Sequence, residues 1–295
     1  MKGIGKTIMI ASALLAGVRA FAQGGADALP FVRCDFGPVL TGSAGAAVAS
    51  TETGPWGVFG KGQALAFGHG AVNAGAEFRV NGEGNNGVSA AVAGKLLGRL
   101  GAGIGVSYLG RDNIGGYKTS DVLLTGAVAF GITEKISVGM NMRYAKQNLT
   151  ESISYSGVSL DFGAMAKLTD GLSATVGLAA IGGKVKGASG GEYSQPGNMY
   201  AGMEYVLDLD NYKLAMDAMG EYYFSGNYGI AAGVAFSYQD MITVRTGYRF
   251  ASEWCVLPSH FAAGLEGKFG HFSLNLGAAK TPATFIVYTG IGFSI

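Results

Sequence analysis

The sequence contains little charge, proline, cysteine and histidine, and these shortages exclude several classes of protein. Of its 295 residues, 14% are charged, 6 are proline, 2 are cysteine and 3 are histidine. The formal net charge of +1 provides no basic stripe for phosphates, which excludes a nucleic-acid partner. The histidines His69, His260 and His271 are not spaced for metal binding with one another or with a cysteine. We therefore expect no enzyme activity, no catalytic residues, no bound metal and no cofactor.

Long apolar runs are also missing after the N-terminus. A transmembrane helix needs about 20 consecutive apolar residues. Here hydrophobic residues make up 48% of the chain and the mean hydropathy is +0.28, but the apolar residues are spread over short segments among 51 glycines. This distribution favours many membrane strands over membrane helices.

The N-terminus has the pattern of a secretory signal. Lys2 and Lys6 precede a short apolar core, 8–18, and Ala20-Phe21-Ala22 forms an A-x-A cleavage site. We expect 1–22 to be a signal peptide.

The two cysteines, Cys34 and Cys255, lie far apart in the sequence. An oxidising compartment would allow them to pair. The sequence does not place them together, so a disulfide and two separate side chains both remain open.

From Ala71 onward, the chain alternates between apolar and small or polar residues in segments of about ten residues. The last segment, 285–295, alternates without a break, with Phe285 and Ile291 on one face and Gly290 and Ser294 on the other. Fourteen segments of this kind are predicted strands: 72–80, 88–96, 100–109, 121–131, 136–147, 157–168, 172–181, 198–207, 212–223, 228–238, 242–250, 260–269, 272–279 and 285–295. An even number of strands is typical of bacterial membrane barrels.

The connections between these segments alternate in length. Tight turns such as 98–99 and 270–271 alternate with longer, more polar connections such as 110–120 and 182–197. Outer-membrane barrels have short periplasmic turns and long outer loops. The sequence therefore predicts an all-β protein, a transmembrane antiparallel β-barrel of about 14 strands over 71–295. We expect it to lie in the cell outer membrane, in contact with lipid, with its N-terminal segment starting in the periplasm.

Charged side chains fall on the face opposite the large apolar side chains, which we take to be the lumenal face. An Arg on the lipid face at the bilayer midplane would cost about 2–4 kcal/mol. The lumenal candidates for a site are Arg143, Arg245, Arg249, Asp217 and Glu221. Two interpretations remain open: these side chains line a ligand site, or the arginines pair with acidic residues and fill the interior.

Residues 23–70 do not alternate. The stretch 42–49 is small, apolar and uncharged. It is unlike a solvated tail, and we expect 23–70 to be a plug, or hatch, inside the barrel. A flexible periplasmic tail is the alternative.

Three stretches resemble the PorV/PorQ group of outer-membrane proteins from Bacteroidetes, relatives of the FadL fatty-acid transporter fold. The stretch 38–49 is similar to the group's small-residue entry segment, 245–250 (Arg-Thr-Gly-Tyr-Arg-Phe) to its late R-x-G-Y-R strand, and 290–295 to its G-x-G-F ending. One motif departs: where the group commonly has Asn-Pro before Ala-x-Leu-Ala, this chain has Lys61-Gly62. The effect of this change on the plug is open.

The resemblance implies a fold with an N-terminal plug and two possible functions. PorV-like proteins act in type IX secretion, where the translocon and the C-terminal domains of cargo proteins would be the partners. FadL-like relatives carry hydrophobic small molecules across the outer membrane. We expect the first function, with the second as the alternative.

Overall fold

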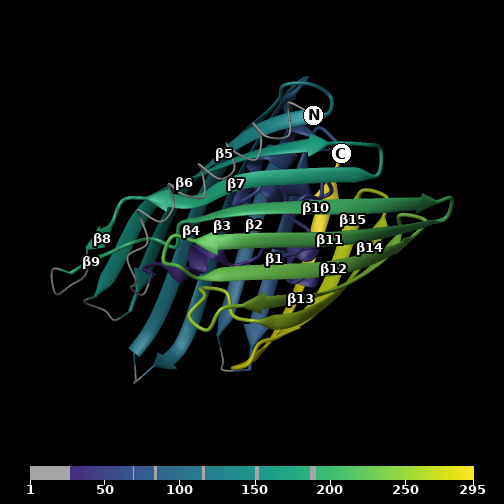
Figure 1. Ribbon diagram of the computed structural model, residues 1–295. Coiled ribbons are helices and arrows are strands. Elements are labelled where there is room, and N and C mark those ends of the chain that lie inside the picture. Colours follow the sequence, from purple (N-terminus) through teal and green to yellow (C-terminus); the bar gives the residue numbers. More distant parts are fainter. Residues whose placement is uncertain (1–26, 69, 83–84, 115–116, 150–152, 187–190) are drawn as a thin grey trace.

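The computed structural model describes residues 27–68, 70–82, 85–114, 117–149, 153–186 and 191–295, and the predicted signal peptide lies outside them. In this part of the chain, fourteen strands form a closed antiparallel barrel (Figure 1). They are β1 (Asn73–Asn81), β2 (Asn86–Leu97), β3 (Leu100–Ile114), β4 (Tyr117–Gly131), β5 (Ile136–Asn148), β6 (Ser154–Lys167), β7 (Leu172–Gly182), β10 (Asn198–Leu209), β11 (Tyr212–Tyr223), β12 (Tyr228–Tyr238), β13 (Ile242–Ala251), β14 (His260–Phe269), β15 (Phe272–Lys280) and β16 (Phe285–Ser294). The predicted fold class is confirmed.

The barrel closes where the last strand pairs with the first. β16 lies between β15 and β1, in register from Asn73 opposite Ser294 to Asn81 opposite Ile286. The short strands β8 (Val185–Lys186) and β9 (Glu192–Tyr193) form a separate hairpin outside the barrel sheet. Closure leaves the sheet without an open edge, which a bilayer requires.

The two ends of the barrel differ in their connections. Tight turns such as 98–99, 210–211 and 270–271 lie at one end, which we call the short-turn end; segments such as 183–197 and 252–259 lie at the other, the long-loop end. The region 110–120, predicted as a loop, is instead mostly a continuation of β3 and β4. Residues 110–120 lack the alternation of apolar and polar residues from which strands were predicted. Backbone pairing, for example between Gly110 and Ser120, nevertheless extends β3 and β4 into this region.

The two faces of the wall carry different side chains. Large apolar side chains point outward and are exposed, among them Val106, Val128, Met142, Ile230, Phe236, Val244, Leu274 and Ile291. Exposed apolar area of this extent requires a lipid environment. The inward positions are buried and mostly small or polar, as alternation along a strand between lipid and lumen dictates.

The plug, residues 27–68 in the structure and purple in Figure 1, lies inside the barrel. It contains the short helices η2 (Pro30–Arg33), α2 (Gly37–Gly42), η3 (Gly54–Phe59) and η4 (Gly62–Ala66). A proline in the first turn of η2, α2 and η3 suits a helix start, because that position needs no amide donor. No helix in the described residues is long and apolar enough to cross a membrane.

The plug runs through the lumen from the long-loop end to the short-turn end. Near its start, the Ala28 amide donates to the Ser194 carbonyl of segment 183–197 (2.8 Å); after its end, the Ala71 amide donates to the Ile295 carbonyl (2.6 Å). The expectation that the N-terminal segment starts on the periplasmic, short-turn side is therefore wrong for the described residues. An even number of strands places the start of the first strand, near residue 71, at the short-turn end. The plug that precedes residue 71 crosses the lumen, so it begins at the long-loop end.

Inward glycines in the wall provide the space in which the plug lies. A Cβ on Gly247 would lie 2.1 Å from the Ser43 carbonyl oxygen, and one on Gly139 would lie 2.2 Å from the Gln63 nitrogen. A Cβ on Gly202 would lie 2.1 Å from a Val48 methyl carbon. At these positions the plug, through its backbone at Ser43 and Gln63 and through a side chain at Val48, lies closer to the wall than a wall side chain would allow.

Candidate functional site

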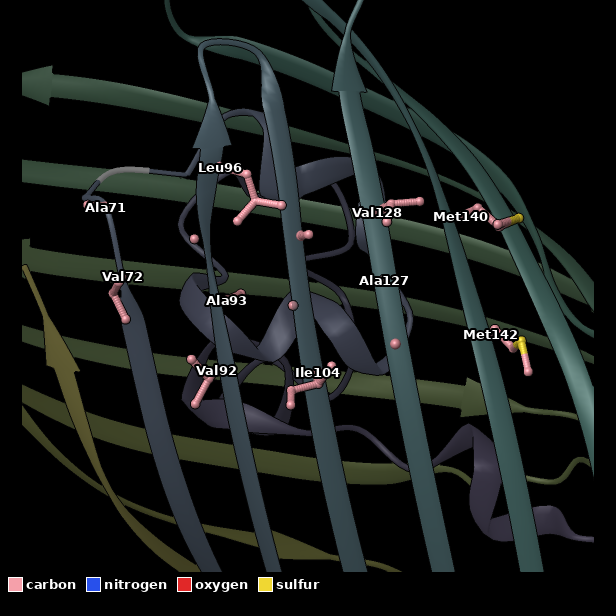
Figure 2. A pocket seen from close by; sticks show the side chains of 14 residues that line it. Ala71, Val72, Val92, Ala93, Leu96, Ile104, Ala127, Val128, Met140 and Met142 are labelled. Carbon is pink, nitrogen blue, oxygen red and sulfur yellow. The ribbon is translucent and has the colours of Figure 1, made fainter.

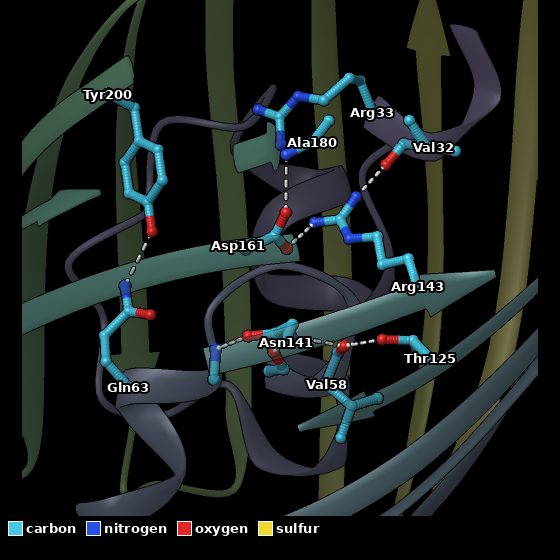
Figure 3. A network of polar contacts seen from close by, with 12 residues as sticks. Val32, Arg33, Val58, Gln63, Thr125, Asn141, Arg143, Asp161, Ala180 and Tyr200 are labelled. Atoms are coloured by element: carbon cyan, nitrogen blue, oxygen red, sulfur yellow. Dashed lines mark hydrogen bonds and ion pairs between the residues drawn. The ribbon is translucent and has the colours of Figure 1, made fainter. Parts of the chain in front are cut away.

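A network of buried polar groups joins the plug to the wall in the interior of the barrel. Arg143 on β5 forms an ion pair with Asp161 on β6, and it also donates to the Val32 carbonyl of the plug (Figure 3). Asp161 accepts a second hydrogen bond from the Ala180 amide (2.7 Å). Ala180 has a φ of +53°, at a point where the pairing of β6 and β7 shifts register. The carboxylate therefore stabilises a backbone conformation that a non-glycine residue rarely adopts.

In the same network, side-chain amides hold η3 and η4 of the plug against the wall. The Gln63 amide donates to the Tyr200 hydroxyl (2.9 Å) and to the Thr175 hydroxyl (3.0 Å). Asn141 accepts from the Gly62 amide (3.0 Å) and donates to the Val58 carbonyl (2.7 Å), as Figure 3 shows. These contacts satisfy plug backbone groups that are shielded from water.

A second cluster lies around Glu221 on β11. Its carboxylate forms ion pairs with Arg249 of β13 and with Arg33 of the plug, the latter at 3.1 Å. It also accepts from the Asn198 amide (2.8 Å) and the Tyr223 hydroxyl (2.7 Å). These four donors fix the Glu221 carboxylate at the junction of the plug and the wall.

The structure brings together only some of the five predicted lumenal candidates. Arg249 and Glu221 form an ion pair, whereas Arg143 pairs with Asp161 and Arg245 pairs with Glu266 at 2.8 Å. Asp217 lies directly opposite Glu204 on the neighbouring strand, and its Oδ1 atom has no hydrogen-bond partner. All three positive candidates are therefore matched by acidic neighbours within the interior.

Sequence reasoning missed the charged residues of the plug. Arg33 bonds to Glu221, and the Asp35 carbonyl accepts from Arg79, whose guanidinium also lies 4.8 Å from the centre of the Phe36 ring. Charged residues within the otherwise small and apolar plug sequence could have indicated these contacts, because a buried charge needs a partner.

Lys61 is a further buried ionisable residue of the plug. Its Nζ atom donates to the Ala47 carbonyl (2.7 Å). Burial lowers the pKa of Lys61 to about 7, while the carboxylates of Asp35, Asp217 and Glu204 act in the opposite direction. The side chain links two parts of the plug across its interior.

The interior has little free space near this network. The cavity between the plug and β10–β13 has a volume of about 40 Å³ and is lined by Arg33, Asp35, Lys61, Glu221 and Arg249, among others. About 30 Å³ is the volume of one water molecule in the liquid. The cavity therefore has no room for a ligand of ordinary size.

Cys34 of the plug and Cys255 of segment 252–259 form no disulfide with each other in the described part of the chain. Of the two possibilities left open by the sequence, the structure contains two separate thiol side chains. Burial raises the pKa of the Cys255 thiol.

A larger apolar hollow, which we call the membrane dent, lies on the outer face of the wall. It has a volume of about 610 Å³ and is lined by residues of β2 to β5 together with Ala71 and Val72, all without charge. Val92, Ile104, Val128 and Met142 surround it, and the helices of the plug lie behind the strands (Figure 2). Its floor consists of small residues: Ala93, Gly94, Ala102, Gly103, Gly126 and Ala127.

A third hollow, the vestibule, opens at the short-turn end. It has a volume of about 480 Å³. Plug residues such as Pro38, Pro55 and Trp56 line one side, and wall residues such as Asn275 and Lys268 line the other. Its lining is both polar and apolar, unlike that of the membrane dent.

Comparison with known proteins supports the fold. No family model and no curated protein matches the sequence. Among solved structures, the chain is similar to the CymD monoaromatic hydrocarbon channel (12% identity, TM-score 0.67, 88% of this chain and 97% of that chain) and to the Ralstonia pickettii toluene transporter TbuX (11%, 0.63, 88% and 97%). It is also similar to a FadL homologue of Pseudomonas aeruginosa (10%, 0.59, 87% and 98%).

At these identities the likeness is one of fold. The chain has the fold of FadL-type outer-membrane barrels, as expected from its loops and faces. These structures do not test the narrower resemblance to PorV/PorQ, which stays a prediction.

Proposed function

We propose that this barrel conducts hydrophobic small molecules across the outer membrane, through its wall or through its lumen. The observation that carries the proposal is the membrane dent, an uncharged hollow of about 610 Å³ over a floor of glycine and alanine. Ligand pockets for small molecules commonly have volumes of about 300–1,000 Å³ and a mainly apolar lining.

The wall beneath the membrane dent is as thin as a strand backbone allows. A Cβ on Gly103 would lie 2.6 Å from a Val58 methyl carbon of the plug, and one on Gly105 would lie 2.7 Å from the Phe59 ring. On the lumenal side, these two plug residues pack with Trp56 and Leu65 in one apolar cluster. An apolar molecule in the dent is thus separated from an apolar interior by backbone alone.

The chemistry of the interior selects against charged solutes. An apolar molecule gains about 25 cal/mol for each Å² of apolar surface removed from water. An ion would need to separate buried pairs such as Arg143–Asp161, at a cost of about 3–5 kcal/mol for a buried charge left without its partner. Monoaromatic hydrocarbons, which the similar CymD channel conducts, are the substrate class to test first. Long-chain fatty acids are the second class, because their carboxylate would have to compete with these buried pairs.

The type IX secretion role implied by the PorV/PorQ resemblance ranks second. No contact among the described residues favours a protein cargo over a small molecule. Recovery of translocon components with a tagged chain from outer membranes would favour the type IX secretion role over small-molecule transport.

Uptake measurements test the proposed function. Cells that express the chain should accumulate labelled toluene or labelled oleate faster than cells with an empty vector. Ala102→Phe places a ring in the membrane dent and should slow uptake several-fold. Ala232→Phe, at an outward and exposed position of β12, is the matched control and should have no effect. Equal accumulation of both compounds with and without the chain would overturn the proposal.

A further inference from the structure

The helix η3 separates the membrane dent from the vestibule. Its first residues, Gly54 to Trp56, line the vestibule. Its last residues, Val58 and Phe59, lie against Gly103 and Gly105 behind the dent floor. The two large hollows therefore lie on opposite sides of one short element of the plug. Toward the long-loop end, by contrast, the space between plug and wall has a volume of about 40 Å³.

The vestibule offers an apolar surface on its plug side. The indole of Trp56 lies over Gly75 of the wall, where a Cβ would be 2.9 Å from the ring. It also stacks on Phe59, with ring centres 6.1 Å apart. Pro38, Val39 and Pro55 continue this surface. The side toward the plug thus suits the body of an apolar molecule.

A buried amide with an unsatisfied atom lies on the wall side of the vestibule. The Asn275 side chain is 5% exposed, and its Oδ1 atom has no hydrogen-bond partner. The amide lies over Gly290, where a Cβ would be 2.9 Å from Oδ1 and 3.0 Å from Nδ2. A buried acceptor without a donor costs about 1–3 kcal/mol. Asn275 lines the vestibule, and rotation of its amide by half a turn exchanges the donor and the acceptor, so the amide is able to donate to or accept from an occupant.

The charges around the vestibule are matched. Glu266 pairs with Arg245 (2.8 Å), Lys213 with Asp240 (2.8 Å), and Lys268 of the wall with Glu52 of the plug (3.9 Å). A charged head group would have to compete with these pairs, whereas an uncharged head group would not.

We propose that the vestibule binds an amphipathic molecule with an apolar body and a hydroxyl head. The body lies against Trp56, and the hydroxyl, which both donates and accepts, bonds to the Asn275 amide. This assignment rests on the proposed function for one point only, that the occupant is a molecule passing between the membrane and the short-turn end. Binding itself is independent of transport.

Intrinsic fluorescence tests binding at this position. The chain has 2 tryptophans, so Trp254→Phe leaves Trp56 as the only one. The probes are bromodecanol and bromodecane, since bromine quenches an indole that it contacts. In Trp254→Phe, bromodecanol should quench saturably and at about three- to tenfold lower concentration than bromodecane, the value of one hydrogen bond. Asn275→Leu should abolish this preference for the alcohol while the alkane still binds.

Two controls separate binding from partition and from transport. Trp56→Phe leaves only the exposed Trp254, which should report non-saturable quenching by probe in the detergent. Ala102→Phe, which fills the membrane dent, should leave quenching of Trp56 unchanged even where uptake is lost. Equal affinity for alcohol and alkane in Trp254→Phe would show that Asn275 binds water only and would overturn the assignment. This comparison uses the wild-type wall, so it does not depend on whether Asn275→Leu folds. Absence of uptake with intact quenching would reject the proposed function and leave the binding site standing.

Discussion

The two halves of the lumen are built from different chemistry. Toward the long-loop end, the plug is held by charged groups such as Arg33, Glu221 and Arg249, around a cavity of about 40 Å³. Toward the short-turn end, the aromatic residues Trp56 and Phe59 of η3 lie between hollows of about 610 and 480 Å³. Buried ion pairs fix a geometry, because removal of one partner leaves an unpaired charge. The segment η3 carries no charge, and its Val58 carbonyl accepts hydrogen bonds from Asn141 (2.7 Å) and Thr125 (2.6 Å) of the wall. Movement of η3 would therefore break neutral hydrogen bonds and apolar contacts, but no ion pair.

This difference places the barrier to ions and the passage for apolar molecules in separate regions. A route that needed the charged half to open would break several pairs at once. A route past η3 would exchange apolar contacts of the plug for apolar contacts with the ligand and would break the hydrogen bonds to the Val58 carbonyl, but it would separate no ion pair, so its cost would be lower.

Removal of one partner from the charged half should have the largest effect on stability. Arg143→Met leaves the Asp161 carboxylate buried with only the Ala180 amide as a donor and should lower the free energy of unfolding by about 3–5 kcal/mol. Urea unfolding in detergent micelles, followed by heat-modifiable gel mobility, measures this. Lys213→Met removes a partly exposed pair with Asp240 and is the control, with an expected loss below about 1 kcal/mol. Similar losses for the two variants would contradict the claim that the interior pairs fix the plug.

A side chain on a glycine under the plug should have the next largest effect. A Cβ at Gly247 would lie 2.1 Å from the Ser43 carbonyl oxygen, so Gly247→Ala should displace the plug backbone and cost about 1–3 kcal/mol. Gly220→Ala is the matched control, because nothing lies within 4 Å of its Cβ position. Protease digestion of the folded barrel should cleave the plug faster in the first variant only. Unchanged cleavage would mean that the wall shifts instead of the plug.

The barrel was predictable from sequence because two solvents impose its pattern. Lipid outside and the packed lumen inside require alternate residues to differ, so all fourteen strands could be recognised, including β16 with Ile291 and Gly290 on opposite faces. The inward or outward direction of Arg143 and Asp217 followed from the same alternation.

The path of the plug could not be predicted, because no periodic pattern describes it. Its contacts join residues far apart in sequence, such as Gln63 with Tyr200 and Ser43 with Gly247. Inward glycines could be recognised as small positions, but not as the positions on which the plug lies. The roles of Asn275 and Gly103 depend on the plug residues near them, and the sequence pattern does not indicate which plug residues these are.

The buried lysine of the plug should produce a moderate, pH-dependent effect. Burial lowers the pKa of Lys61 from 10.5 to about 7, so the unfolded chain binds one more proton than the folded chain between these values. The free energy of unfolding should therefore rise as the pH increases from about 7 toward 10.5. Lys61→Met should reduce this slope, measured as the urea midpoint at several pH values in that range. An identical slope in the wild type and in Lys61→Met would contradict burial of a titrating amine.

The smallest effect is expected at the mouth of the vestibule, where the Lys268 and Glu52 side chains are both exposed and lie 3.9 Å apart. Exposed pairs contribute between zero and about 1 kcal/mol, and salt screens them. Lys268→Met should therefore leave the urea midpoint nearly unchanged. It should also leave the affinity for bromodecanol unchanged in the Trp254→Phe background, because the proposed head-group contact is with Asn275 and not with a charge. A marked change in affinity that disappears at high salt would instead assign the head group to the charged rim, and the vestibule would then select its occupant by charge, which would remove the contrast between the two halves of the lumen.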